Sequence, residues 1–322
     1  MLMTSPLPHV PVMLDRVTEL LVDTPDGVYV DLTLGAAGHA HEICTQRVER
    51  HGRAHLVGLD RDPDALELAR QRLADLDDRV EVQLTHARFD RLDEVLDGLG
   101  IDTVAAVLMD LGISSMHVDR ADRGFSYRQE GPLDMRMDPT QSTTAGEIVN
   151  TYERNEIARL LRRHGDEKFA DRIARAIVAA RPLGSTTELA EVVKHAIPAA
   201  ARRTGGHPAT RTFQALRIAV NDELEALAAV LPLAIERLAP GGVCLALSYH
   251  SLEDRLVKRA FADAASGCIC PRGLPVCACG RVPLVDHVVR RPERPDAVET
   301  DRNPRAAAAR LRAVRRVPES RS

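Results

Sequence analysis

The first third of the chain contains acidic residues and glycines in the spacing of a nucleotide-cofactor site. Residues 29–40 read YVDLTLGAAGHA, in which a short apolar run ends at Asp31 and two glycines open a turn. Glycines at such a turn let the backbone approach a ligand closely. A second apolar run, 55–59, is followed by Asp60, whose carboxylate could accept hydrogen bonds from both hydroxyls of an adenosine ribose. These residues predict a cofactor site on a strand-helix-strand unit.

The turn and Asp31 together indicate which cofactor binds. A dinucleotide site would carry the pattern G-x-G-x-x-G, whereas positions 33, 35 and 38 are Thr, Gly and Gly. A carboxylate repels a pyrophosphate but attracts the sulfonium and ammonium groups of S-adenosylmethionine. We therefore expect S-adenosylmethionine as the cofactor. An NAD-dependent dehydrogenase is one alternative, and a glycine turn that binds no ligand is another.

The ends of the apolar runs limit the reaction. In a parallel sheet the carboxyl ends of the strands meet at one edge, so Asp31, Asp60, Asp110 and residues 248–255 (SYHSLEDR) should converge on one crevice. Methylation of a pyrimidine at carbon 5 needs a nucleophilic cysteine, and none of these strand ends has one. Transfer to nitrogen or oxygen is favoured. An exocyclic amine needs only its lone pair in line with the methyl group and an acceptor for its hydrogens.

Two residues at these strand ends are candidates for the catalytic step. Asp110 could accept the amine hydrogens, or it could support the methionine end of the cofactor, and the sequence weighs the two roles equally. His250 could carry a proton or stack on a base, although a capped structural histidine is the commoner outcome at a strand end.

Strands and helices alternate around these positions, which predicts a doubly wound α/β sheet. The expected strands are short apolar runs at 28–32, 55–59, 80–84, 104–110 and 243–249. Residues 124–139 are interrupted by glycine and proline and are predicted to form an irregular loop. From residue 144 onward helical signals dominate, with a last helix near 208–238, so a helical block is inserted between two strands of one sheet.

The composition fits a cytoplasmic protein. Its 322 residues, 44% of them hydrophobic, can bury the core of one large or two modest domains. No apolar run approaches the roughly 18 residues of a membrane-spanning helix, so we expect no membrane contact. A net charge of -4 predicts no strong overall attraction to nucleic acid, which local patches would have to supply.

Several blocks of the sequence together resemble the bacterial MraW (RsmH) family of S-adenosylmethionine-dependent methyltransferases, which act on cytosine N4 of small-subunit ribosomal RNA. The blocks are HVPVMLDRV at 9–17, DLTLGAAGH at 31–39, LDRDP at 59–63, MDLGISS at 109–115, RGFSYRQEGPLDMRMD at 123–138, HPATRTFQALRIAVNDEL at 207–224, SYHSLEDRLVK at 248–258 and NPRAAAARLRAV at 303–314.

The resemblance implies a Rossmann-like class I methyltransferase sheet with an inserted all-helical domain. We expect the methyltransferase domain at 1–118 and 218–322 and the substrate-recognition domain at 119–217. The implied substrate is cytosine 1402 of 16S rRNA within the small ribosomal subunit. A homodimer is compatible with the sequence. The implied cofactor contacts are Ala37, Gly38, His39, Asp60, Phe89, Asp110 and His117.

Basic residues suggest where RNA would bind. If 123–138 and 207–217 line the mouth of the cleft, their arginines would hold phosphates while the strand ends receive a flipped-out cytosine. Either arginine of the second segment, Arg211 or Arg217, could instead be structural. The following residues form either a solvated face or a phosphate-facing one: Arg154, Arg159, Arg162, Arg163, Lys168, Arg172 and Arg175.

Residues 268–322 leave two questions open. Cys268, Cys270, Cys277 and Cys279 form the pattern CxC-x6-CxC, which offers enough thiolates for zinc. Reduced loop cysteines or a redox-sensitive pair are favoured, because CxC orients two ligands less readily than CxxC, and no metal is predicted. The arginine-rich segment from 281 onward predicts a solvated, partly mobile tail, with an RNA-contacting arm as the alternative.

A function of a different class is a noncatalytic RNA-binding ribosome assembly factor, in which the cofactor fold is a relic. A relic would have lost Asp60 or the glycine turn, and both are present.

Overall fold

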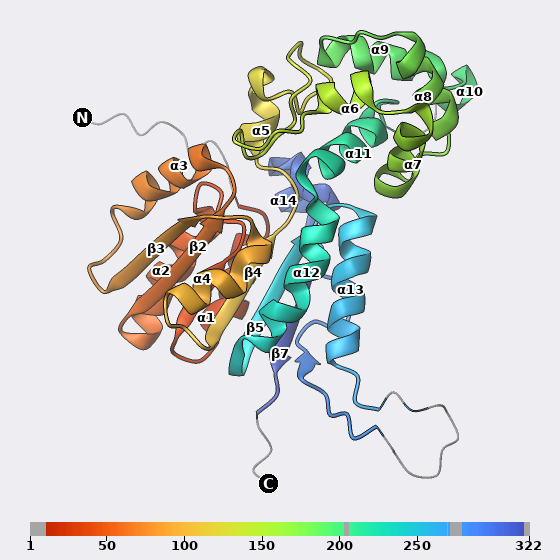
Figure 1. The fold of residues 1–322 in the computed structure, drawn as a ribbon. Helices are drawn as coiled ribbons and strands as arrows, with labels where there is room; N and C mark the ends of the chain where they lie inside the picture. Colours follow the sequence, from red (N-terminus) through yellow and green to blue (C-terminus); the bar gives the residue numbers. More distant parts are fainter. Residues whose placement is uncertain (1–10, 203–205, 269, 271–278, 319–322) are drawn as a thin grey trace, which may run out of the picture. The chain divides into compact units, whose positions relative to one another are not determined.

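The computed structural model describes residues 11–202, 206–268, 270 and 279–318. The chain forms two compact units, one from Met1–Gly112 with Leu224–Ser322 and one from Ile113–Glu223 (Figure 1). The sequence predicts these boundaries after residues 118 and 217. In the part of the chain that the structure describes, no helix is both long and apolar enough to cross a membrane.

The first unit is built on a seven-stranded sheet with the order β3-β2-β1-β4-β5-β7-β6. The strands are β1 (Val28–Asp31), β2 (Ala54–Asp60), β3 (Val80–His86), β4 (Val104–Asp110), β5 (Leu238–Ser248), β6 (Val285–His287) and β7 (Arg310–Arg316). Strands β1 to β5 pair with one another in parallel, and β7 is antiparallel to both β5 and β6. The strand order reverses between β1 and β4, which is where such a sheet binds its ligand. The predicted α/β fold with a helical insertion is confirmed.

Helices cover both faces of this sheet (Figure 1). Neighbouring strand residues point to opposite faces, so Tyr29 lies in one core and Val30 in the other. The first core is completed by α1 (Leu14–Val22), α2 (Gly38–His51) and α3 (Pro63–Leu73). The second is completed by α4 (Leu92–Gly98), α12 (Glu223–Glu236) and α13 (Ser251–Ala264). Burial on both faces explains why these strands read as continuous apolar runs.

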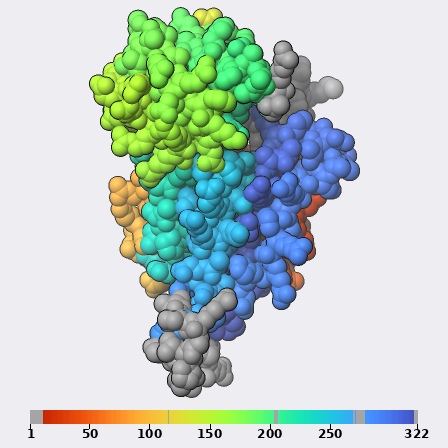
Figure 2. Space-filling view, turned by 90° about the vertical axis from the view of Figure 1, so that its right-hand side faces the viewer, coloured from red at the N-terminus to blue at the C-terminus, as the bar shows by residue number. Residues whose placement is uncertain are grey.

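The prediction of a solvated tail is wrong for residues 310–316. These residues form β7, which lies between β5 and β6 and not at an edge of the sheet. Leu311 and Ala313 are fully buried, while Arg310 and Arg312 alternate with them and both donate to the carboxylate of Asp254 on α13 at 2.8 Å. Figure 2 shows the light-blue atoms of α13 beside the darker blue C-terminal segment. The arginines therefore form ion pairs that join the strand to a helix.

The second unit consists of short helices around a core of its own. They are α5 (Ser115–Asp119), α6 (Ala145–Thr151), α7 (Arg154–Gly165), α8 (Ala170–Ala179), α9 (Thr186–Ala196), α10 (Ala199–Arg202) and α11 (Thr210–Asn221), with a 3-10 turn η2 at Ala121–Arg123. Thr144 caps α6 and Ser185 forms a capping box with Glu188 at α9, as the sequence predicted. The single helix expected over 208–238 is broken, because Asp222 adopts the left-handed conformation with φ 50°.

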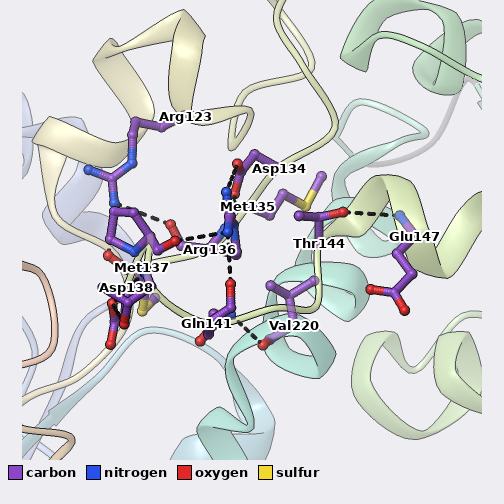
Figure 3. Close-up of polar contacts among 12 residues, drawn as sticks. Arg123, Asp134, Met135, Arg136, Met137, Asp138, Gln141, Thr144, Glu147 and Val220 are labelled. Atoms are coloured by element: carbon purple, nitrogen blue, oxygen red, sulfur yellow. Dashed lines mark hydrogen bonds and ion pairs between the residues drawn. The ribbon is translucent and has the colours of Figure 1, made fainter.

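The irregular loop predicted at 124–139 is held by polar side chains (Figure 3). Arg136 makes two hydrogen bonds to Asp134, at 2.8 and 2.7 Å, and also donates to the carbonyls of Pro139 and Gln141. Arg123 is buried and donates to the carbonyl of Met137 at 2.8 Å. Such charge-assisted bonds to carbonyls replace the missing secondary structure. Two of the arginines predicted to hold phosphates thus stabilise the loop itself.

Candidate active site

The glycine turn between β1 and α2 has the conformation that its residue types require. Gly35 and Ala37 both have positive φ, 53° and 57°. A Cβ atom at Gly38 would lie 2.5 Å from Cγ of Pro11, so only glycine fits against that ring. Helix α2 begins at Gly38, and its first amide groups point toward the turn. The turn therefore brings bare backbone to the carboxyl ends of the strands.

Asp60 ties the end of β2 to this turn. Its Oδ2 accepts a hydrogen bond from the amide of Gly35 at 2.8 Å, and its Oδ1 accepts from the amide of Asp62 at 2.8 Å. The side chain is half-buried, and each carboxylate oxygen can accept a further hydrogen bond. The position suits an acceptor for vicinal hydroxyl groups, which agrees with the role expected from the sequence.

Asp31 is a deeply buried carboxylate at this edge, with 2% of its surface exposed. Tyr29 donates its hydroxyl to Oδ2 at 3.0 Å, and the amide of Thr33 donates to Oδ1 at 3.1 Å. Burial raises the pKa of Asp31 to about 6. The protein thus holds a negative charge in low-dielectric surroundings at neutral pH, where a cationic ligand would offset its cost.

Asp110 lies at the end of β4, next to Thr33 after β1, Tyr249 after β5 and His39 of α2. Its amide donates to Thr33 Oγ1 at 2.7 Å, which links it to the turn after β1. Tyr249, which directly follows β5, donates its hydroxyl to Asp110 Oδ1 at 2.7 Å. On the other side, Nδ1 of His39 lies 3.6 Å from Oδ2. The Asp110 side chain is 20% exposed.

His39 is a neutral neighbour of Asp110. Burial lowers the pKa of His39 below its ordinary value, and Nε2 lies 2.9 Å from the carbonyl of Val12. A carbonyl accepts only a hydrogen, so we assign the hydrogen to Nε2, and Nδ1 then presents a lone pair toward Asp110. Nδ1 of His39 and the Asp110 carboxylate can therefore both act as acceptors for one proton.

His250 caps a helix. It is the N-cap residue of α13, where Nδ1 accepts from the amide of Glu253 at 3.3 Å and the Glu253 carboxylate accepts from the amide of His250 at 3.2 Å. Nε2 of the same ring lies 3.1 Å from Glu253 Oε1. This geometry matches the capping role that the sequence left open beside the catalytic one.

The remaining predicted residues lie at different places. Phe89 begins the short 3-10 helix η1 (Phe89–Arg91) after β3, where it is half-buried against the second core of the first unit. His117 belongs to α5 of the second unit, where it is buried and its ring centroid lies 4.9 Å from that of Phe125.

The structure brings together the ends of β1, β2 and β4, as predicted. Thr33 bonds to both Asp31 and Asp110, while Gly35 bonds to Asp60. Tyr249 and Thr33 were not among the predicted site residues. The only signal for Tyr249 was its place in the SYHSLEDR segment, and its contact with Asp110 spans 139 positions of the chain.

Comparison with known proteins gives matches over nearly the whole chain. A family model described as the MraW methylase family matches residues 6–317. A protein named Ribosomal RNA small subunit methyltransferase H from Acidothermus cellulolyticus is 53% identical and covers 97% of this chain and 95% of its own. Proteins of the same name from Symbiobacterium thermophilum and Thermobifida fusca are 50% and 51% identical; they cover 95% and 98% of this chain, and both alignments span 96% of the relative.

Proposed function

The chain belongs to the MraW methylase family, and from that premise we propose that it methylates N4 of a cytosine, cytosine 1402, in the 16S rRNA of the small ribosomal subunit. It is an S-adenosylmethionine-dependent methyltransferase of small-subunit rRNA. The observation that carries the proposal is the meeting of Asp31, Asp60 and Asp110 around one glycine turn.

These residues fit S-adenosylmethionine, which supplies an electrophilic methyl group when bound. Asp60 would accept hydrogen bonds from the ribose hydroxyls, since its carboxylate stands at the end of β2 beside the glycine turn. Ala37, Gly38 and His39 would lie along the cofactor, because helix α2 begins at Gly38 and its first amide groups point toward the turn. Asp31 and Asp110 supply the negative charge that a sulfonium or ammonium group needs. Phe89 and His117 are proposed as further cofactor contacts.

Asp110 is the residue that we propose to bind the exocyclic amine of the target cytosine. Its carboxylate would accept a hydrogen bond from the exocyclic N4 amine, which directs the nitrogen lone pair away from the carboxylate and toward the methyl group. Tyr249 holds one oxygen of Asp110 by a charge-assisted hydrogen bond, so it acts as a positioning residue. His39 stays neutral at pH 7 because of its burial, and its Nδ1 could share the proton that the amine releases.

His250 has two proposed roles, as the cap of α13 and in proton transfer. Its capping bonds with Glu253 favour a structural function, and participation in proton transfer stays a prediction. Helix α13 starts at the carboxyl end of β5, so loss of the cap would also disturb Tyr249, whose amide donates to Glu253 at 2.8 Å.

The second unit carries the residues that we propose for RNA binding. The basic side chains of α7 and α8 are exposed, and Arg154, Arg162 and Arg175 all interact with Asp171. Clustered cations of this kind bind phosphates without reading sequence. Arg217 is a poorer candidate, because it makes two hydrogen bonds to Glu223, at 2.8 and 2.7 Å, with only 11% of its side chain exposed.

We propose the cytoplasm as the site of action, because small ribosomal subunits are assembled there. Self-association into a homodimer is a separate prediction, which sedimentation velocity of the purified chain would test.

The decisive experiment is a nucleoside digest of small-subunit rRNA from cells with and without this protein, analysed by mass spectrometry. We expect N4-methylated cytidine to depend on the protein and on Asp110. Appearance of 5-methylcytidine, or no change in any methylated nucleoside, would reject the proposal. A noncatalytic assembly factor predicts a third pattern, in which subunits assemble poorly while S-adenosylmethionine fails to bind.

A further inference from the structure

Three cysteines outside the proposed active site have their sulfur atoms close together. Cys268, Cys270 and Cys279 each offer one Sγ, and these atoms all lie within 4.8 Å of one another. Cys268 and Cys270 follow α13, and Cys279 returns to the same place from later in the chain. The fourth cysteine of the CxC-x6-CxC pattern, Cys277, lies outside the described residues.

Contacts at the base of this segment explain why its ends meet. The amide of Leu284 donates to the carbonyl of Ala264, the last residue of α13, at 2.9 Å. Arg281 donates to the carbonyl of Asp263 at 2.7 Å and to its carboxylate at 3.0 and 3.2 Å. Cys279 therefore precedes a residue that is anchored on the helix end, and Cys268 follows that end. The convergence of the thiols rests on the fold and not on the thiols themselves.

The distance between two of the sulfur atoms distinguishes the chemical alternatives. Sγ of Cys279 lies 3.9 Å from Sγ of Cys268. A disulfide requires about 2.05 Å, so these two residues are not bonded. Two thiolates that bind one tetrahedral zinc ion, each at about 2.3 Å from the metal, lie about 3.8 Å apart. The observed separation is close to that of two zinc ligands, and it also allows a thiol hydrogen bond from Cys279 to Cys268 in the metal-free protein.

A hydrogen-bond donor and a positive charge lie near the sulfur atoms. The amide of Cys270 donates to Sγ of Cys268 at 3.4 Å. Arg281 brings a positive charge to the position two residues after Cys279, and the two groups interact electrostatically. From the sequence, the CxC spacing does not favour a metal site. In the structure, the contacts between the end of α13 and the residues before β6 bring the cysteines together.

We propose that Cys268, Cys270 and Cys279 bind a thiophilic divalent metal ion, zinc in the cell. The ion replaces the thiol protons, which are released to solvent, and it ties the segment after α13 to the segment that leads into β6. The role is structural, because the site contains none of the residues that we place at the cofactor. The proposal does not depend on methyl transfer, and its test reads metal binding directly.

The test is a cobalt titration of the full-length chain after removal of metal with a chelator under reducing conditions. We expect one equivalent of cobalt to produce a sulfur-to-cobalt charge-transfer band and the visible bands of a tetrahedral thiolate site, and one equivalent of zinc to abolish them. Zinc should also raise the melting temperature, since a ligand that binds only the folded state stabilises it.

Cysteine substitutions identify which residues bind the metal. Cys268→Ser and Cys279→Ser should each lose the charge-transfer band, whereas Cys44→Ala, which removes a fully buried thiol from the core of the first unit, should retain it. Unchanged S-adenosylmethionine affinity would show that the serine variants are folded. No thiolate band in the unmodified chain, or a band that survives both serine substitutions, would overturn the proposal. So would the loss of two titratable thiols on air oxidation without metal uptake, which indicates a redox pair.

Discussion

Tyr249 donates its hydroxyl to Asp110 at 2.7 Å, and this bond joins the ends of two adjacent parallel strands. Gly112 makes the approach possible. A Cβ atom at that position would lie 3.2 Å from Cδ2 of the tyrosine ring, and its φ of 97° is one that side chains rarely tolerate. One oxygen of the proposed catalytic carboxylate is thus held by the protein.

Substitutions in this pair should separate catalysis from positioning. We expect Asp110→Asn to lower the single-turnover rate of methyl transfer by about 100-fold or more, the usual contribution of a positioned acid-base group. Tyr249→Phe should lower the rate less and leave the affinities for RNA and cofactor unchanged. A wild-type rate in Asp110→Asn would remove this residue from the mechanism, and a Tyr249→Phe effect on binding alone would contradict its positioning role.

Asp60→Ala should weaken S-adenosylmethionine binding by about 10- to 100-fold, because a charged acceptor of hydrogen bonds contributes about 1.5–3 kcal/mol. Isothermal titration calorimetry measures the change. Asp64→Ala is the matched control, since Asp64 is an exposed carboxylate in the first turn of α3. Equal cofactor affinity in the wild type and Asp60→Ala would contradict the assignment.

The raised pKa of Asp31 predicts how stability depends on pH. Burial raises this pKa from 3.8 to about 6, so between these values the folded protein keeps a proton that the unfolded chain has released. Stability from this group therefore falls as pH rises through that window, by up to about 3 kcal/mol. Asp31→Asn lacks the titration, so its stability relative to the wild type should increase from pH 4 to pH 6.5.

Urea unfolding at several pH values tests this relation in the absence of cofactor. If the difference in free energy of unfolding between Asp31→Asn and the wild type does not change with pH, the Asp31 carboxylate is not desolvated. We also expect the variant to bind S-adenosylmethionine more weakly at pH 7, because the amide lacks the negative charge.

His250→Ala should cost about 1 kcal/mol of stability through the loss of the α13 cap. Asparagine is an effective N-cap residue that cannot carry a proton, so His250→Asn separates the two roles. We expect near-normal melting temperature and methyl transfer in His250→Asn. A folded but inactive variant would instead establish His250 as catalytic.

Two groups of arginines should respond differently to substitution. Arg154→Ala with Arg175→Ala should weaken RNA binding and lower the slope of log affinity against log salt by about 1.5, since fewer counterions are released. Lys194→Ala, an exposed cation of α9 paired with Glu191, is the control. Filter binding across a salt series gives both slopes, and an unaltered slope in the double variant would place the RNA surface elsewhere.

Arg217→Ala should instead lower the melting temperature, because it leaves Glu223 buried without its partner, a loss of about 3 kcal/mol. The salt slope of this variant should match that of the wild type.

Local patterns were sufficient for much of the fold. The strand predicted at 104–110 has those bounds in the structure, because a fully buried parallel strand is a continuous apolar run. The helix break at Asp222 carried no glycine or proline signal. Strand β7 was missed because alternating arginines resemble a solvated tail, and their partner, Asp254, lies 56 and 58 positions away.

In the site, too, the features set by local sequence were predictable and the long-range contacts were not. Carboxylates at the strand ends were predictable, since parallel strands share one edge. The bond between Tyr249 and Asp110 depends on the pairing of β4 with β5 across the inserted unit, which no local pattern encodes.

The position of β7 between β5 and β6 has a consequence for biosynthesis. A chain emerges from the ribosome with its amino terminus first, so β1 to β5 are available to pair before residues 310–316 exist outside the exit tunnel. Until then β5 is an open edge whose amides and carbonyls can pair with another nascent chain. Chains that terminate before residue 310 keep that edge unpaired. Only a chain translated through β7 pairs the edge of β5 within its own sheet.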